Sequence, residues 1–132
     1  KILDKNPNVH FLIYGGPSKK EKGKLDLLVN GLSGYVTSFV GNSLRETAAI
    51  MSKTNLYIGV DTGPTHIMST FNVPMVVLFH CKLKSKIYGA LEHPYYFAID
   101  HPNKKNCSET SAMSDISVKK VFDTVSRALE AL

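Results

Sequence analysis

Hydrophobic residues along the chain gather in short runs that alternate with segments of helical periodicity. Residues 9–14 form a nearly continuous apolar run, which is typical of a strand buried on both faces of a sheet. Similar runs at residues 35–40, 55–60, 74–79 and 95–99 predict four further strands, of which the last is short.

Helical patterns occupy most of the intervals between these runs. A helix is predicted around residues 20–30, because the apolar residues of that segment share one face. They are Leu25, Leu28, Val29 and Leu32. Ser43 and Glu46 have the spacing of a capping box, which predicts a helix running from there through Met51.

Two more helices are predicted in the second half, a short one at residues 64–71 and a closing one at residues 117–132. The closing helix carries an apolar stripe that we expect to pack into the core. The stripe consists of Val118, Val121, Val125, Leu129 and Leu132. Residues 81–93 fit neither pattern, and residues 101–114 have the character of a loop.

Strands that alternate with helices predict parallel pairing with right-handed crossovers, hence an α/β fold with a three-layer, Rossmann-like parallel sheet. The 132 residues are enough for one domain, and we expect residues 1–132 to form a single one. Ligands of such sheets bind beyond the carboxyl ends of the strands. The loops to examine are therefore residues 15–21, 41–43, 61–66 and 79–84.

Charge and cysteine content narrow the class of protein. The formal net charge is +5, with lysines clustered at residues 19–24, 82–86 and 104–105. Such clusters bind phosphates, nucleic acid or anionic membranes, or they are solvated loops. The first cluster lacks the interleaved aromatic residues of single-strand binders, so no nucleic-acid partner is expected. Cys81 and Cys107 are too few to indicate a disulfide framework, and a reducing cytosol is the default compartment.

The start of the chain carries neither Met nor a signal-peptide pattern. We therefore expect a fragment of a longer protein. No apolar run approaches the roughly 20 residues that a membrane-spanning helix needs.

The segment with the clearest chemistry is residues 58–68, where an apolar strand ends at Asp61 and a helix is expected to start at Pro64. Free backbone N–H groups near Gly63, Thr65 and His66, together with the helix dipole, are expected to form an anion site suited to a diphosphate. His66 is expected to donate to a phosphate oxygen, and Asp61 either to accept from sugar hydroxyls or to orient neighbouring N–H groups. The alternative is an ordinary turn with an N-cap and a histidine bonded to backbone.

The hexapeptide Asp61-Thr62-Gly63-Pro64-Thr65-His66 resembles the Asp-Ser/Thr-Gly-x-x-His signature of the ADP-heptose:lipopolysaccharide heptosyltransferases, glycosyltransferase family nine. Four other stretches agree with that family in the same order. They are residues 11–17, 42–46, 74–79 and 116–118. The resemblance implies the C-terminal, Rossmann-like half of a GT-B glycosyltransferase, the half that binds the donor's nucleotide and diphosphate.

The resemblance also implies an activity for the intact enzyme. It would transfer a heptose-like sugar from ADP-heptose or a related nucleotide sugar to a lipid-linked saccharide of the lipopolysaccharide core. The reaction would invert the anomeric centre, at the cytoplasmic face of the bacterial inner membrane, with peripheral membrane association and without a cofactor. The general base is expected in an N-terminal acceptor domain that this chain lacks, so the chain alone is expected to bind donor but not to catalyse.

The expected donor-binding residues fall into two groups. The signature supplies Asp61, Thr62, Gly63, Pro64, Thr65 and His66. The other loops supply Gly15, Gly16, Lys19, Glu21, Asn42 and Lys82.

One loop departs from the family pattern. His80-Cys81-Lys82 stands where the family usually has Gly-Pro-Thr, which bears on the identity of the donor. His80 next to Cys81 suggests metal binding, but no partner pair lies at finger-like spacing, so no metal site is expected.

Two other functions remain open from the sequence. The domain is alternatively a nucleotide-binding module without transferase activity. It is also compatible with a different Rossmann-like nucleotide-sugar enzyme, such as an epimerase.

Overall fold

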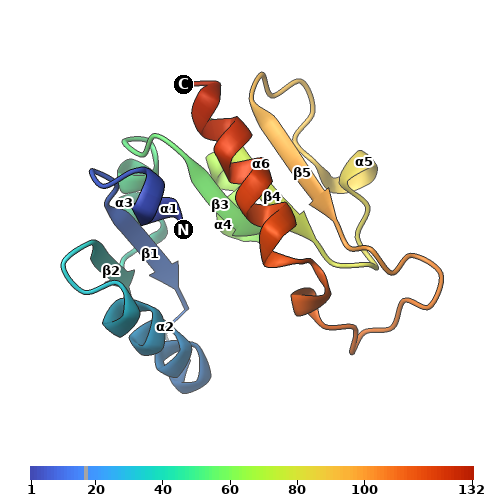
Figure 1. Ribbon diagram of the computed structural model, residues 1–132, viewed down its shortest axis with the longest axis horizontal. Helices are drawn as coiled ribbons and strands as arrows, with labels where there is room; N and C mark the ends of the chain where they lie inside the picture. Colours follow the sequence, from blue (N-terminus) through green and yellow to red (C-terminus); the bar gives the residue numbers. More distant parts are fainter. Residues whose placement is uncertain (17) are drawn as a thin grey trace. The chain divides into compact units, whose positions relative to one another are not determined.

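The computed structural model describes residues 1–16 and 18–132, which form two compact units, residues 1–47 and 48–132. Strands and helices alternate along the chain, and every strand pair is parallel (Figure 1). The predicted α/β class with parallel sheets is therefore confirmed. The two units are described separately, and a single domain over the whole chain stays a prediction.

The first unit is built on two parallel strands and one long helix. Its elements in chain order are α1 (Ile2–Lys5), β1 (Phe11–Gly15), α2 (Lys19–Gly31) and β2 (Val36–Val40). The register places Phe11 opposite Val36 and Gly15 opposite Val40. Ser18 caps α2 by accepting a hydrogen bond from the backbone N–H of Glu21.

Burial in this unit is lower than the apolar patterns predict. Strand β1 is half-buried at all five positions, because within its unit it has one strand neighbour instead of two. Of the predicted apolar face of α2, Leu25 is buried whereas Leu28 is 53% exposed. The expectation of a strand buried on both faces was thus wrong for β1.

Helix α3 (Leu44–Met51) begins at the predicted capping box. The backbone N–H of Glu46 donates to Ser43 Oγ at 3.3 Å, and the backbone N–H of Ser43 donates to Glu46 Oε2 at 2.8 Å. The pKa of the Glu46 carboxyl is lowered mainly by a hydrogen bond from the Ser43 hydroxyl to Oε2, at 2.8 Å, and then by the bond from the Ser43 backbone N–H, because both favour the charged form.

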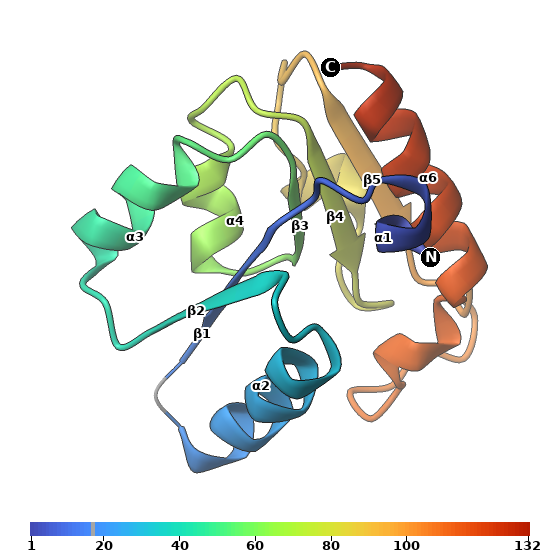
Figure 2. The ribbon, with the colours of Figure 1, turned by 60° about the vertical axis from the view of Figure 1, so that its left-hand side comes forward.

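The second unit is a three-stranded parallel sheet in the order β3-β4-β5. Its elements are β3 (Tyr57–Val60), α4 (Gly63–Met68), β4 (Met75–Phe79), α5 (Ser85–Tyr88), β5 (Tyr96–Asp100), a 3-10 turn η1 (Met113–Asp115) and α6 (Val118–Glu130). Helices α4 and α6 lie on opposite faces of this sheet (Figures 1 and 2). The predicted three-layer arrangement is present in this unit.

The core of the second unit lies around the central strand β4. Met75, Val76, Val77 and Phe79 are fully buried, as a strand with neighbours on both edges and helices on both faces should be. Each such side chain contributes roughly 1.5–3 kcal/mol of transfer free energy.

Helix α6 packs on this core through Val125 and Ala128, with Val121 and Leu129 half-buried. Val118 and Leu132, at the two ends of the predicted stripe, are 72% and 66% exposed, so the stripe was predicted too long at both ends. Residues 81–93 contain the short helix α5, and the predicted loop at 101–114 leads into η1.

No helix in the described part of the chain combines the length and the apolar character needed to cross a membrane.

Candidate functional site

The signature residues lie where β3 ends and α4 begins. Asp61 follows the last residue of β3, Thr62 is extended at the N-cap, and Pro64 occupies the first turn of the helix. One helical turn brings His66 back over Asp61, with Nε2 3.2 Å from Asp61 Oδ1. The carboxylate side chain is 8% exposed and the imidazole 64% exposed. The pair therefore presents a histidine to solvent with a carboxylate behind it.

Asp61 Oδ1 is a buried oxygen without a hydrogen bond within the described residues. His66 Nε2 is close to it, but the contact lies outside hydrogen-bonding geometry. An unsatisfied buried acceptor costs about 1–3 kcal/mol, and more when it is charged. A donor supplied by a ligand, or a small rotation of the His66 ring, would satisfy this oxygen.

Thr65 fixes the start of α4 to the strand before it. Its hydroxyl donates to the carbonyl oxygen of Val60 at 2.5 Å and lies 2.8 Å from the hydroxyl of Tyr57. The Thr65 side chain is buried, with 4% of the residue exposed. Thr65 thus holds the loop between Asp61 and His66 in place and does not itself present a side chain to solvent.

The absence of a side chain at Gly59 allows the Tyr57 hydroxyl to reach Thr65. A Cβ at Gly59 would lie 2.6 Å from both Cε1 and Cζ of the Tyr57 ring, closer than real contacts allow. The ring therefore lies along the strand over Gly59 and reaches Thr65 with its hydroxyl. Burial raises the pKa of Tyr57, and the hydrogen bond with Thr65 lowers it in part.

The backbone of this loop differs from the sequence-based expectation. The N–H groups of Thr65 and His66 both donate to the carbonyl of Thr62, at 3.0 and 3.3 Å. The expectation that these N–H groups are free for an anion was therefore wrong for Thr65 and His66, and it stays a prediction for Gly63. A Cβ at Gly63 would meet nothing within 4 Å, so the loop is open at Gly63. At His66, a contact with a ligand would therefore have to come from the side chain.

The Thr62 hydroxyl does not cap the helix. It donates to the carbonyl of Val60 at 3.3 Å, and no side-chain capping bond is formed at the N-cap. Thr62 is thus the N-cap that the alternative interpretation expects, but without a side-chain capping bond.

The first loop belongs to the other unit. A Cβ at Gly16 would overlap Glu21 Oε2 and lie 3.3 Å from Glu21 Cδ, so this carboxylate rests directly on the glycine backbone. Gly15 gives room to the side chain of Leu25, whose Cγ would be 3.3 Å from an added Cβ. Lys19 is exposed. Pro17, part of the resemblance, lies outside the described residues.

Asn42 and Lys82 are both exposed in loops that follow strands. Asn42 comes after Gly41, whose φ of +86° ends β2 in the left-handed region that glycine favours. Lys82 follows β4, and its backbone N–H donates to His80 Nδ1 at 3.3 Å. The structure thus brings together the six signature residues, and separately Gly16 with Glu21. That both sets serve one ligand stays a prediction.

Beyond the ends of β4 and β5 lies a cavity of about 230 Å³ with a basic lining. It is lined by Cys81, Leu83, Lys84, Lys86, Asp100, His101 and Lys104. Asp100 accepts hydrogen bonds from the backbone N–H and the hydroxyl of Ser85, at 3.0 and 3.1 Å. Two lysine clusters far apart in the sequence therefore meet here, which the linear pattern did not reveal.

Tyr96 on β5 is a second feature that the sequence did not single out. Burial, and after it the charges of Asp61 and Asp100, raise its pKa to about 12, although a hydrogen bond with the Ala90 backbone acts the other way. The negative charges of Asp61 and Asp100 therefore both act on Tyr96.

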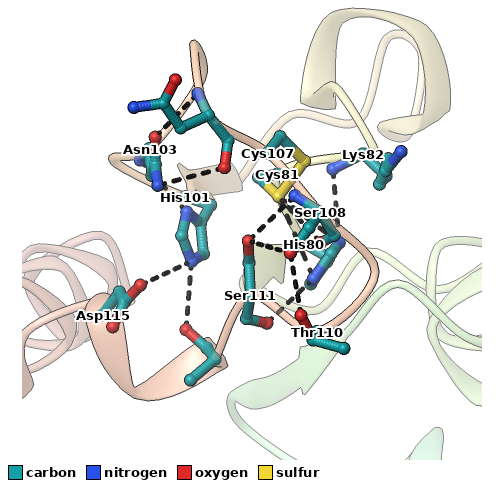
Figure 3. The surroundings of a disulfide bond; sticks show 12 residues. His80, Cys81, Lys82, His101, Asn103, Cys107, Ser108, Thr110, Ser111 and Asp115 are labelled. Carbon is teal, nitrogen blue, oxygen red and sulfur yellow. Dashed lines mark hydrogen bonds and ion pairs between the residues drawn. A yellow bond between two sulfur atoms is a disulfide. The ribbon is translucent and has the colours of Figure 1, made fainter.

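The His80-Cys81-Lys82 loop, which follows β4, is linked by a disulfide to the segment that precedes α6. Cys81 and Cys107 form a disulfide, with Cα atoms 5.6 Å apart (Figure 3). The sequence indicated no disulfide framework, because a separation of 26 residues says nothing about proximity in space. His80 Nε2 lies 3.0 Å from the carbonyl oxygen of Ser111, and His101 Nε2 lies 3.0 Å from that of Ala112.

Known proteins resemble this chain in sequence and in fold. The family model described as glycosyltransferase family 9 (heptosyltransferase) matches residues 2–120. A lipopolysaccharide core heptosyltransferase, OpsX, of Haemophilus influenzae is 26% identical over 89 residues, covering 65% of this chain and 26% of that protein. The crystal structure of a family 9 glycosyl transferase from Veillonella parvula superposes with a TM-score of 0.78 at 22% identity, covering 93% of this chain and 37% of that one. The likeness to that structure concerns the fold.

Proposed function

Because the chain belongs to glycosyltransferase family 9, the heptosyltransferase family, we propose that it is the donor-binding part of a sugar transferase. The donor is a nucleoside diphosphate sugar, ADP-heptose or a close relative, and the acceptor is a lipid-linked saccharide of the lipopolysaccharide core. The chain spans about a quarter of the curated relative's length, and a further domain supplies the acceptor site and the general base.

The observation that carries this proposal is the Asp61–His66 pair. Among the described residues, this buried carboxylate oxygen has no hydrogen-bond partner, and it lies 3.2 Å from an exposed imidazole at the carboxyl end of a parallel strand. A protonated His66 would give Nε2–H to Asp61 and leave Nδ1–H for an oxygen of the donor's diphosphate. Asp61 would then orient the His66 ring and balance its positive charge. The buried Asp61 oxygen would gain a hydrogen-bond donor, and the exposed Nδ1–H of His66 would gain an acceptor.

The same pair suits the chemistry of inverting transfer. As the acceptor hydroxyl attacks the anomeric carbon, the bond to the diphosphate oxygen breaks and negative charge grows on the leaving group. A cationic His66 placed at that oxygen stabilises the charge more in the transition state than in the bound donor. Lys82 after β4 and Lys19 on α2 are the candidates for further phosphate contacts. No metal ion is needed for this step.

Thr62, Gly63 and Pro64 form the exposed wall of this site, and Thr65 acts as a positioning residue beneath it. In the first unit we propose Gly15, Gly16, Glu21 and Asn42 as contacts to the nucleoside, with Glu21 held against Gly16.

The alternative is a nucleotide-binding module without transferase activity. Family membership disfavours the epimerase alternative. A transfer assay on the full-length gene product decides between enzyme and module. We place the intact enzyme at the cytoplasmic face of the bacterial inner membrane, because both the nucleotide-sugar donor and the lipid-linked acceptor are expected there.

The proposal is tested by calorimetric titration of the 132-residue chain with ADP, and then with UDP and GDP. We expect saturable 1:1 binding of one nucleotide, weakened at least about tenfold in His66→Ala, as the loss of roughly 1.4 kcal/mol of a charge-assisted hydrogen bond requires. His10→Ala, which removes another exposed histidine outside the signature, is the matched control and should bind like the parent.

Asp61→Asn gives a second test. It keeps the size of the side chain but removes the charge behind His66, so binding should fall although the fold is retained. Equal affinities in the parent, His66→Ala and Asp61→Asn would contradict the assignment of the donor diphosphate to this pair.

A further inference from the structure

Away from the signature, one cluster of metal-ligating side chains stands out in the second unit. His80, Cys81 and Cys107 each offer a ligand atom, and these atoms all lie within 4.8 Å of one another. All three residues are half-buried. Figure 3 shows them converging from the end of β4 and from the loop that precedes α6. Two thiol sulfurs and an imidazole nitrogen are the ligands that zinc prefers.

We propose that this cluster is a redox-gated zinc site, closed as a disulfide when oxidised and able to bind one Zn²⁺ when reduced. A dithiol reductant first converts the disulfide to two thiols and is itself oxidised to a disulfide. Zn²⁺ then binds both sulfurs and the His80 ring, and the two thiol protons are released to solvent. Because two thiolates balance the metal charge, the site is neutral among the neighbouring lysines.

The orientation of His80 supports this role. The backbone N–H of Lys82 donates to Nδ1, so Nδ1 carries a lone pair and Nε2 carries the proton that is donated to Ser111. Histidines that bind metals usually donate their second ring N–H to a carbonyl or carboxylate, which fixes the tautomer. Here Nδ1 is therefore the ligand atom: it lies 3.8 Å from Cys81 Sγ, and Zn²⁺ would replace the Lys82 N–H at its lone pair.

The distances match a tetrahedral site after reduction. Zinc bonds of about 2.3 Å to sulfur and about 2.0 Å to nitrogen place neighbouring ligand atoms roughly 3.5–3.8 Å apart. The Cys81–His80 separation already has this value, and Cα atoms 5.6 Å apart allow the two sulfurs to separate by side-chain rotation. Water completes the fourth position.

His101 is excluded as a ligand, although its ring centroid lies 5.9 Å from that of His80. Its Nδ1 accepts from the backbone N–H of Asn103 at 3.1 Å, and its Nε2 donates to the carbonyl of Ala112. His101 shares this bonding pattern with His80, but no ligand atom of His101 belongs to the cluster of atoms within 4.8 Å of one another, and its side chain is fully buried.

The experiment titrates the reduced 132-residue chain with Co²⁺ and then with Zn²⁺ under anaerobic conditions. We expect thiolate-to-cobalt charge-transfer absorption that saturates at one ion per chain and is displaced by Zn²⁺. The oxidised chain should show none. His80→Ala should weaken binding by more than the roughly 10–100-fold that loss of an outer-shell partner costs.

His93→Ala is the matched control. His93 has the same pattern of ring hydrogen bonds, with Nδ1 accepting from Tyr95 N–H and Nε2 lying 2.9 Å from the Phe71 carbonyl oxygen, but it is not part of the cluster. This variant should bind cobalt like the parent.

A second readout needs no variant. One equivalent of Zn²⁺ should protect both thiols of the reduced parent from iodoacetamide. Thiols that react at the same rate with and without Zn²⁺, or zinc uptake that survives Cys107→Ser unchanged, would overturn the proposal.

Discussion

The hydrogen bond between Thr65 and Tyr57 offers the sharpest test of how the signature loop is held. Thr65→Val removes the hydroxyl that donates to the Val60 carbonyl and lies 2.8 Å from the Tyr57 hydroxyl. The replacement has nearly the same volume, so the change is mainly one of polarity. Leaving buried polar partners unsatisfied costs about 1–3 kcal/mol each, and the added methyl group returns about 0.8 kcal/mol. With two partners affected, we expect a net loss of roughly 1–5 kcal/mol.

A double-mutant cycle isolates the bond itself. Thr65→Val, Tyr57→Phe and the double variant are unfolded in urea, and the coupling energy is calculated from the four free energies of unfolding. A hydrogen bond between these partners predicts a coupling of about 0.5–1.5 kcal/mol. With a urea dependence of about 2 kcal/mol per molar, the loss in Thr65→Val lowers the midpoint by roughly 0.5–2.5 M. Additivity within about 0.3 kcal/mol would refute the reasoning.

Three further outcomes follow from other contacts. Gly59→Ala forces the Tyr57 ring away from its position 2.6 Å from the new Cβ, and thermal melts should show a loss of about 1–3 kcal/mol, whereas unchanged stability would show that the ring moves freely. The lowered pKa of Glu46 contributes stability above its ordinary pKa of 4.5 that is lost as pH falls through the folded value. The stability advantage of the parent over Glu46→Gln should therefore shrink on acidification in pH-dependent urea melts, and a constant difference would contradict the capping bonds. Cys107→Ser should lower the stability of the oxidised chain by about 3.5 kcal/mol, the loop-closure entropy of a 26-residue separation, and should unfold like the reduced parent in the presence of a chelator.

The elements that the sequence predicts best are those with a local cause. The capping box at Ser43 and Glu46 needs only residues three apart, and the apolar run of β4 needs only burial from both faces. The start of α4 follows from Pro64 and the preceding glycine. These signals are contained in a few neighbouring residues, so the pattern alone suffices.

Features that depend on distant residues were predicted less well. The apolar run of β1 looks like that of β4, but its burial depends on how many neighbours the strand acquires. The Thr65 and His66 N–H groups were expected to be free, whereas both donate hydrogen bonds to the carbonyl oxygen of Thr62. The disulfide and the lysine-lined cavity join residues some 20 or more positions apart, and no spacing rule connects them.

Donor binding at the Asp61–His66 pair is tested most directly by amide chemical shifts. The ¹⁵N-labelled chain is titrated with ADP, and the experiment is repeated on His66→Ala. Binding at the proposed site predicts saturable shifts at Gly63 and His66, together with shifts at Gly15 and Gly16 in the first loop, all weakened in the variant. Saturable shifts centred on other residues and unchanged in His66→Ala would contradict it.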